Sequence, residues 1–130
     1  MALESNFNRF DDLVVMTLKG FPTAVDLASE YQHILDSEQF VQGMPSIWDC
    51  SEIDLKRIPI SEVRRLPHLL RQFSGRRGTN YKAAIVTNRG SDFQLLRIYL
   101  TILKMIGEIH FRVFRNLEEA NLWIKGQRQD

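Results

Sequence analysis

Short apolar runs separated by turn residues open the chain, and a helical repeat follows them. Apolar runs at residues 7–10 and 13–18 flank two aspartates at 11–12, which predicts two strands joined by a hairpin turn. Thr23 and Asp26 then form a capping-box pattern. The residues behind this pattern recur at the i, i+3, i+4 and i+7 spacing of an amphipathic helix: Ala24, Leu27, Ala28, Tyr31, Ile34 and Leu35.

A strand and a second helix are expected next. A turn at residues 43–45 precedes a short apolar strand at 46–50, which ends in polar residues. Ser61 can cap the following helix, and we expect Pro67 to kink this helix or delay its start. A Gly-Arg-Arg-Gly turn at 75–78 ends it. One stripe of the helix is apolar: Val63, Leu66, Leu70 and Phe73.

The next predicted strand and helix form the most apolar part of the chain. The run at residues 82–86 is bounded by turn residues, as is typical of a buried central strand. The next helix begins with Ser91 or Asp92 as its cap and runs toward Gly107. Residues 110–114 form the last predicted strand.

A final helix completes the predicted order. Asn116 and Glu119 repeat the capping-box pattern ahead of it. The order ββαβαβαβα predicts an α/β fold with a mixed, mainly parallel five-stranded sheet and four helices. The length of 130 residues suits one domain, which we place at residues 1–125 with a polar tail at 126–130.

Three stretches carry a resemblance to a known family: IWDCSEIDLKRIPISEVRRL, KAAIVTN and FRNLEEANLWI. Together with the element order, they resemble the STAS-like superfamily, which has the SpoIIAA-like fold of anti-sigma-factor antagonists and is related to Sec14-type lipid-binding domains. The resemblance spans nearly the whole chain. It rests on order, lengths and a diffuse pattern, and it implies a non-enzymatic interaction module.

Ser61 marks a departure from that family. In the phosphorylatable branch, a serine within an Asp-Ser-Ser/Thr-Gly type motif opens the second helix and switches partner binding. Here the matching stretch is Pro59-Ile60-Ser61-Glu62, without the aspartate and the glycine. Glu62 would repel an incoming phosphate, so helix capping is favoured over phosphorylation at Ser61.

Charge is distributed unevenly although the net charge is only +1. Residues 1–55 hold ten acids and two bases, whereas residues 56–82 hold eight bases and one acid. The basic segment is a candidate for contact with an anionic partner, and a solvated face is the plainer reading. Nucleic acid is disfavoured because only Phe73 and Tyr81 are available there for base stacking. The candidate contact residues are Arg64, Arg71, Arg76 and Arg77.

Polar residues follow two of the predicted strands. In an open parallel sheet, ligands bind beyond the carboxyl ends of the strands. The sequence therefore predicts a binding rim between these two strand ends, with turn formation and capping as the alternative role. The tentative rim residues are Trp48, Asp49, Thr87, Asn88 and Arg89.

The third helix has more apolar residues than one buried stripe requires. Three explanations are open: full burial inside the fold, a homodimer face, or contact with lipid or a membrane surface. The residues proposed for a dimer or membrane face are Leu96, Tyr99, Leu100 and Leu103.

Catalytic chemistry has weak support. Cys50 with His33, His68 or His110 would be needed for a thiolate pair, yet a single cysteine at a strand end is more often a buried hydrophobe. The histidines lack metal-ligand spacing, and no phosphate-binding glycine loop follows a strand. We therefore expect no enzyme activity, metal or cofactor.

The predicted function is a non-enzymatic STAS-like interaction module that forms a homodimer and binds a protein partner or a small anionic ligand. The alternative is a peripheral lipid-binding or membrane-binding domain that uses the apolar third helix and the basic second helix. A single cysteine and the absence of a signal-peptide pattern predict a cytoplasmic location, peripheral to the membrane under the alternative.

Overall fold

The structure is a computed structural model that describes residues 3–8, 12–20, 23–88 and 90–126. Side-chain burial is described for the same residues except 3–8 and 91. Within these residues the chain folds as an α/β sheet structure, which confirms the predicted class.

The sheet follows the order of the chain, β1-β2-β3-β4-β5. Strands β2 to β5 are mutually parallel, and β1 pairs with β2 in the antiparallel direction at one edge. The strands are β1 (Leu3–Asn8), β2 (Leu13–Lys19), β3 (Ser46–Glu52), β4 (Tyr81–Val86) and β5 (Ile109–Phe114). The predicted turn between β1 and β2 falls largely outside the described residues, apart from Asp12, which has a left-handed φ of 51°.

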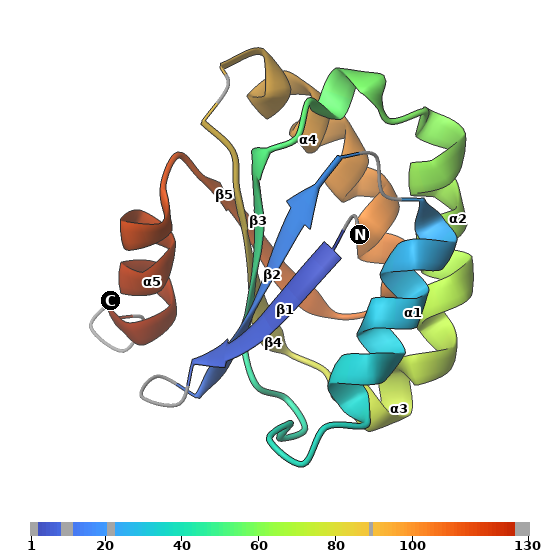
Figure 1. The fold of residues 1–130 in the computed structure, drawn as a ribbon, viewed down its shortest axis with the longest axis vertical. Coiled ribbons are helices and arrows are strands. Elements are labelled where there is room, and N and C mark those ends of the chain that lie inside the picture. The colour runs from blue at the N-terminus through green and yellow to red at the C-terminus, as the bar shows by residue number, and fades with distance from the viewer. Residues whose placement is uncertain (1–2, 9–11, 21–22, 89, 127–130) are drawn as a thin grey trace.

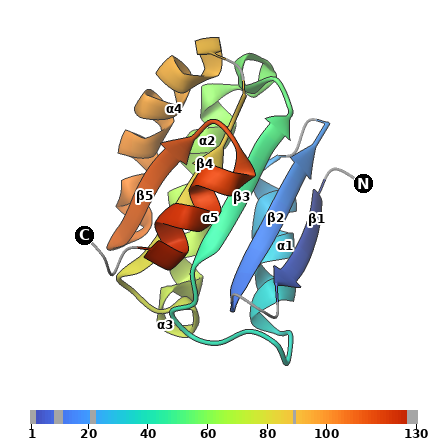
Figure 2. The ribbon, with the colours of Figure 1, turned by 90° about the vertical axis from the view of Figure 1, so that its left-hand side faces the viewer.

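The helices form two unequal layers. Figure 1 shows α1, α2, α3 and α4 on one face of the sheet and α5 alone on the other, and Figure 2 shows α5 lying across the strands. The α-helices are α1 (Ala24–Leu35), α2 (Ile60–Leu70), α3 (Ser74–Arg77), α4 (Gly90–Leu103) and α5 (Leu117–Gly126). Three short 3-10 turns accompany them: η1 (Leu55–Arg57), η2 (Arg71–Phe73) and η3 (Lys104–Ile106).

The strand order explains this asymmetry. Each parallel strand lies beside the one before it, so every crossover moves in the same direction along the sheet. Because such crossovers are right-handed, all of them pass over the same face. α2 lies between α1 and α4 in that layer. Only α5, which follows the last strand, is free to cover the opposite face.

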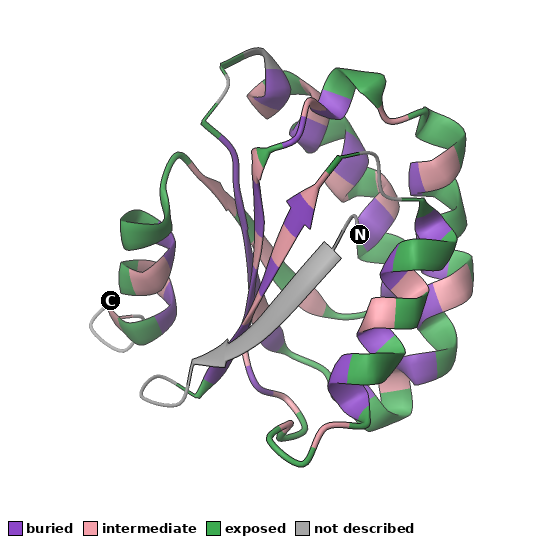
Figure 3. Ribbon diagram, viewed as in Figure 1, coloured by how far each residue is buried: buried purple, intermediate pink, exposed green. Residues whose placement is uncertain are grey.

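Each face of the sheet has its own apolar core, as the burial pattern in Figure 3 indicates. The main cluster lies between the sheet and α1, α2 and α4, and it includes Met16, Cys50, Leu66, Ile85 and Leu96. The minor cluster lies under α5 and consists of Leu13, Ile47, Ala84, Val86, Ala120 and Ile124. Neighbouring residues of a strand alternate between the two clusters, as the pleat requires.

The first residues of the helices show which of the predicted N-caps form. Thr23 and Asp26 form the complete capping box, and Asn116 accepts a hydrogen bond from the backbone N–H of Glu119 at 2.8 Å. The cap at Ser61 is wrong, since α2 begins at Ile60 behind an extended Pro59 and has no side-chain cap. Burial of an apolar stripe, rather than a capping hydroxyl, fixes where this helix begins.

Three further boundaries differ from expectation. α2 runs through Pro67, so of the two effects expected of this proline, a kink or a delayed start, the delayed start is wrong. α4 begins at Gly90, so Asp92 lies in its first turn and not at its cap. The predicted glycine stop is displaced as well: α2 ends at Leu70, and Gly78 ends the separate helix α3.

Candidate functional site

The predicted rim residues lie on both faces of the sheet. Trp48 packs half-buried against the main cluster, and Ile47 belongs to the minor cluster. Because side chains alternate along a strand, Asp49 points to the face that carries α5. Its Oδ1 accepts hydrogen bonds from the backbone N–H of Ser51 at 3.1 Å and from the Ser51 hydroxyl at 2.6 Å. Asp49 therefore stabilises its own strand end.

The other half of the rim is divided too. Thr87 is fully buried, and its backbone N–H donates to the Phe114 carbonyl oxygen at 3.0 Å. Asn88 is exposed, whereas Arg89 lies outside the described residues. The described rim residues thus do not line one pocket, because alternation along β3 separates Trp48 from Asp49.

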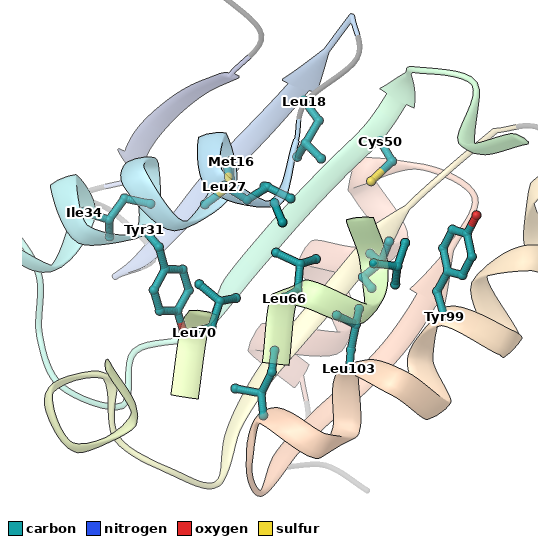
Figure 4. Packing of buried hydrophobic residues seen from close by; sticks show 14 of the residues in the cluster. Met16, Leu18, Leu27, Tyr31, Ile34, Cys50, Leu66, Leu70, Tyr99 and Leu103 are labelled. Atoms are coloured by element: carbon teal, nitrogen blue, oxygen red, sulfur yellow. The ribbon is translucent and has the colours of Figure 1, made fainter. Parts of the chain in front are cut away.

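A cavity does lie near the same ends of the strands, on the face covered by α1, α2 and α4. Its volume is about 60 Å³. Figure 4 shows Cys50, Leu66 and Tyr99 around this part of the core. The polar groups of its lining are the Glu62 carboxylate, the Cys50 thiol, the Tyr99 phenol and the Trp48 indole N–H. The lining residues are Leu18, Ala24, Leu27, Trp48, Cys50, Leu55, Ile58, Glu62, Val63, Leu66, Ile85, Leu96, Tyr99 and Leu103.

Polar contacts hold the elements around this cavity in place. Glu62 Oε1 accepts a hydrogen bond from the backbone N–H of Ala24 at 2.7 Å, which ties the start of α1 to α2. The Tyr99 hydroxyl lies 3.4 Å from the Leu55 carbonyl oxygen and 3.2 Å from that of Ile58, to which it donates. The cavity is therefore bounded by fixed hydrogen bonds, and its interior is left to apolar groups.

Cys50 is poorly suited to nucleophilic chemistry. Burial raises the pKa of its thiol to about 12, and the nearby carboxylates of Asp49 and Asp92 contribute to the rise. The thiol is therefore protonated at neutral pH. His33, His68 and His110 are all exposed, whereas Cys50 is buried, so the sequence's candidate thiolate pair is not formed.

Asp92 is the most deeply buried acid among the described residues, with no exposed surface. Its Oδ2 accepts a long hydrogen bond of 3.4 Å from the backbone N–H of Leu55, and its Oδ1 has no partner among the described residues. No group of three histidine, cysteine or acidic side chains in the described part of the chain could hold a metal ion.

The four candidate arginines have different environments. Arg76 pairs with Asp36 at 2.6 Å, and Arg77 is buried. Arg71 is exposed and donates from Nη2 to the Met105 carbonyl oxygen at 3.0 Å, while Arg64 is exposed on α2. The prediction of one shared anionic contact face is therefore wrong for Arg77, and Arg76 already has a carboxylate partner.

The predicted outer face of α4 needs a correction. Leu96, Tyr99 and Leu103 are buried in the main cluster, and Leu100 is half-buried against it. Their apolar surplus is absorbed because α4 contacts α2 and η1 as well as the sheet. Full burial, one of the three explanations left open by the sequence, accounts for these residues.

Two other large apolar residues, in the segment formed by α4 and η3, are exposed. Ile98 is 53% exposed and Met105 is 62% exposed. Ile98 lies in α4 and Met105 lies seven residues later in η3, which continues α4, so the two residues lie near one side of this helical segment. Sequence reasoning missed them because the pattern of this segment contains several overlapping apolar stripes. Arg77 was missed as a buried residue, since nothing in a Gly-Arg-Arg-Gly run predicts that one arginine is enclosed.

No helix among the described residues has the length and apolar character needed to cross a membrane. In comparisons with known protein families, with curated proteins and with solved structures, the chain has no significant match. Functional inference therefore depends on the geometry of the chain itself.

Proposed function

We propose that the chain is a non-enzymatic binding domain of the STAS-like kind that attaches reversibly to anionic lipid surfaces. Support for the STAS-like part comes from the element order and the parallel strands β2 to β5, which agree with the resemblance in the sequence. The lipid part rests on one observation: exposed apolar residues of α4 and η3 lie beside exposed arginines of α2 and η2. We call Arg64, Arg71, Ile98 and Met105 the α2–α4 surface.

The geometry of the α2–α4 surface follows from the fold. α2 connects β3 to β4, and α4 connects β4 to β5. Because these strands are parallel, the two helices run in the same direction. The bond from Arg71 to the Met105 carbonyl brings the ends of the two segments together. Arg64 on α2 lies seven residues before Arg71, and Ile98 on α4 lies seven residues before Met105, so the two residues lie at similar levels along the pair of helices.

Charge favours an anionic surface over a second copy of the chain. The exposed positions described in α2, α4 and η3 include the bases Arg64, Arg65, Arg97 and Lys104, and no acid. Two copies joined through this surface would bring like charges together. A homodimer, which the sequence predicted, stays a prediction, and its surface would have to include Ile98 and Met105 rather than Leu96, Tyr99 and Leu103.

The expected affinity is modest and dependent on salt. Full burial of an isoleucine or methionine side chain contributes roughly 1.5–3 kcal/mol, so two half-exposed residues contribute about half of that each. Each base near an anionic leaflet adds about 1 kcal/mol, and salt screens this part. The apolar and electrostatic contributions of these four residues are therefore of similar size, and their modest sum is typical of a reversible peripheral protein.

Co-sedimentation with vesicles tests the proposal. Vesicles of phosphatidylserine and phosphatidylcholine should bind the chain at low salt and release it at high salt, and vesicles of phosphatidylcholine alone should bind it weakly. Ile98→Glu should lower binding at least tenfold. Val25→Glu is a matched control, because Val25 is also 53% exposed but lies on α1. Arg64→Gln and Arg71→Gln should each lower binding about fivefold.

Two outcomes would count against lipid attachment. Equal loss of binding in Ile98→Glu and Val25→Glu would remove the α2–α4 surface as the cause. A concentration-dependent dimer in analytical ultracentrifugation that Ile98→Glu abolishes, together with no vesicle binding, would favour the homodimer instead.

The cavity beside Cys50 favours a second function, the uptake of a small apolar group. Its volume of about 60 Å³ exceeds the roughly 10–15 Å³ that a cavity needs to hold one water molecule, and its lining offers few hydrogen-bond partners. A short alkyl group fits this chemistry better than the small anionic ligand predicted from the sequence. Glu62 is the one charged group of the lining.

A ligand titration tests this second function. Addition of hexanol should shift the NMR resonances of cavity residues such as Leu66 and Tyr99 and leave those of the minor cluster unchanged. Leu96→Phe, which adds atoms at the cavity wall, should weaken the effect severalfold. Uniform shifts across both clusters would contradict a specific site.

A further inference from the structure

Arg77 is a buried cation at the opposite end of the main cluster, near the amino ends of the strands. It is the last residue of α3 and is 3% exposed. Its guanidinium carbon lies 3.5 Å from the centroid of the Tyr81 ring and 5.6 Å from that of Phe40. Aromatic rings attract a cation through their faces, but they offer no acceptor for the N–H groups in the guanidinium plane.

The terminal N–H groups of Arg77 have no hydrogen-bond acceptor in the described part of the chain. Both Nη1 and Nη2 are buried without a hydrogen-bond partner among the described residues, and no described carboxylate lies within ion-pair distance of them. The neighbouring carboxylate of Asp36 is bound by Arg76. Arginine stays charged at any physiological pH, and an unpaired buried charge is strongly unfavourable. Within the described part of the chain, the site therefore has a charge and donors without an acceptor.

Two small cavities, each of about 10 Å³, are lined by Arg77. A volume of this size is about what one water molecule, or an ion of similar size, needs. Tyr31 lines both cavities, and its hydroxyl lies 3.2 Å from that of Tyr81. Ser46, which is buried, lines the first cavity, and Glu108 lines the second. Hydroxyl donors thus accompany the guanidinium on the side of β3.

The backbone fixes Arg77 in this position. Its carbonyl oxygen accepts a hydrogen bond of 2.8 Å from the N–H of Gly43. The next residue, Gly78, has a φ of 94°, and a Cβ there would lie 2.9 Å from the Gly43 nitrogen. Only glycine is accommodated at this contact without movement of the backbone. The close approach of the two loops therefore holds the guanidinium inside the core.

We propose that Arg77 anchors a buried binding site for a small inorganic monoanion of halide size. One uncompensated positive charge calls for one negative charge. Cavities of this size exclude phosphate, carboxylate ligands and headgroups. The Tyr31 and Ser46 hydroxyls supply further donors to an anion in the first cavity. This site is independent of the α2–α4 surface, and either proposal can fail without the other.

Thermal unfolding at fixed ionic strength tests the site. Replacing gluconate by chloride or bromide should raise Tm by about 4 °C once the halide is at ten times its Kd. Arg77→Met should abolish this rise. Arg76→Met should retain it, since Arg76 is exposed and paired with Asp36. A rise of equal size in both variants would overturn the proposal.

A crystal of the unaltered protein grown with bromide gives a test that does not depend on a variant that folds. An anomalous peak within hydrogen-bonding distance of Arg77 Nη1 or Nη2 is the expected result. Water density alone at this place would overturn the proposal. A second result would also overturn it: halide raises the Tm of Glu108→Gln but not that of the unaltered protein. Glu108 would then be the counter-ion of Arg77 in the unaltered protein.

Discussion

The two ends of the main cluster differ in how the space between the sheet and the helices is filled. At the carboxyl ends of the strands, apolar side chains surround a cavity of about 60 Å³ and the polar groups stay at its boundary. At the amino ends, Arg77 is enclosed with two aromatic rings, and the cavities beside it have volumes of only about 10 Å³ each. One end therefore leaves volume unfilled, and the other leaves charge unpaired.

The comparison separates two kinds of binding. An unfilled apolar volume can accept a neutral group without loss of hydrogen bonds, and an unpaired guanidinium selects for charge. Strand β3 reaches both ends, since Ser46 lines the cavity beside Arg77 and Cys50 lines the larger cavity. Substitutions along one face of one strand can therefore distinguish the two ends.

Truncation of a leucine at each end should have the largest effect. Leu96→Ala and Leu70→Ala should each lower the free energy of unfolding by about 3 kcal/mol, measured by urea denaturation. Leu96 lines the larger cavity and Leu70 lines one of the small ones. Benzene should recover part of the loss in Leu96→Ala alone, because only there does the new volume join an existing apolar cavity. Recovery in both variants would remove the distinction between the ends.

Larger side chains on β3 should change the free energy of unfolding less than the leucine truncations do. The sign of the change should differ between the two ends. Ser46→Val should destabilise the fold by about 2 kcal/mol, since it overfills a small cavity beside a charged group. Cys50→Val should stabilise the fold by about 0.5 to 1 kcal/mol, since it fills part of the larger cavity. Urea denaturation measures both values. A stabilising Ser46→Val would mean that the amino end is not closely packed.

The smallest expected effect is the pH dependence of Cys50. The thiol's ordinary pKa is near 9.0, and burial raises it to about 12 in the folded chain. Unfolding therefore releases a proton between these values, and stability falls as pH rises. From pH 9 to 10 the unaltered chain should lose about 1 kcal/mol more than Cys50→Val. The window stops at pH 10 because burial also raises the pKa of Tyr99, with Asp92 adding to the rise. Equal slopes for both proteins would contradict a buried, protonated thiol.

The sequence by itself determined the order of the elements, because local rules govern it. Periodicity and capping residues located α1 and α5 closely, and the apolar run of β4 was placed to within one residue. The α/β class followed from alternation of strands and helices. The start of α2 was less predictable, since a serine and a proline near a helix end allow more than one starting point.

Only the tertiary structure decided which side chains face one another. Alternation across β3 separated Trp48 from Asp49, and packing against α2 and η1 buried Leu96 while leaving Ile98 exposed. The enclosure of Arg77 depends on the approach of Gly43 to Gly78, which are far apart in the sequence. Such contacts depend on where each crossover passes over the sheet. Local patterns carry no information about that, and for this reason the cavity beside Cys50 and the enclosed Arg77 became visible only in the folded chain.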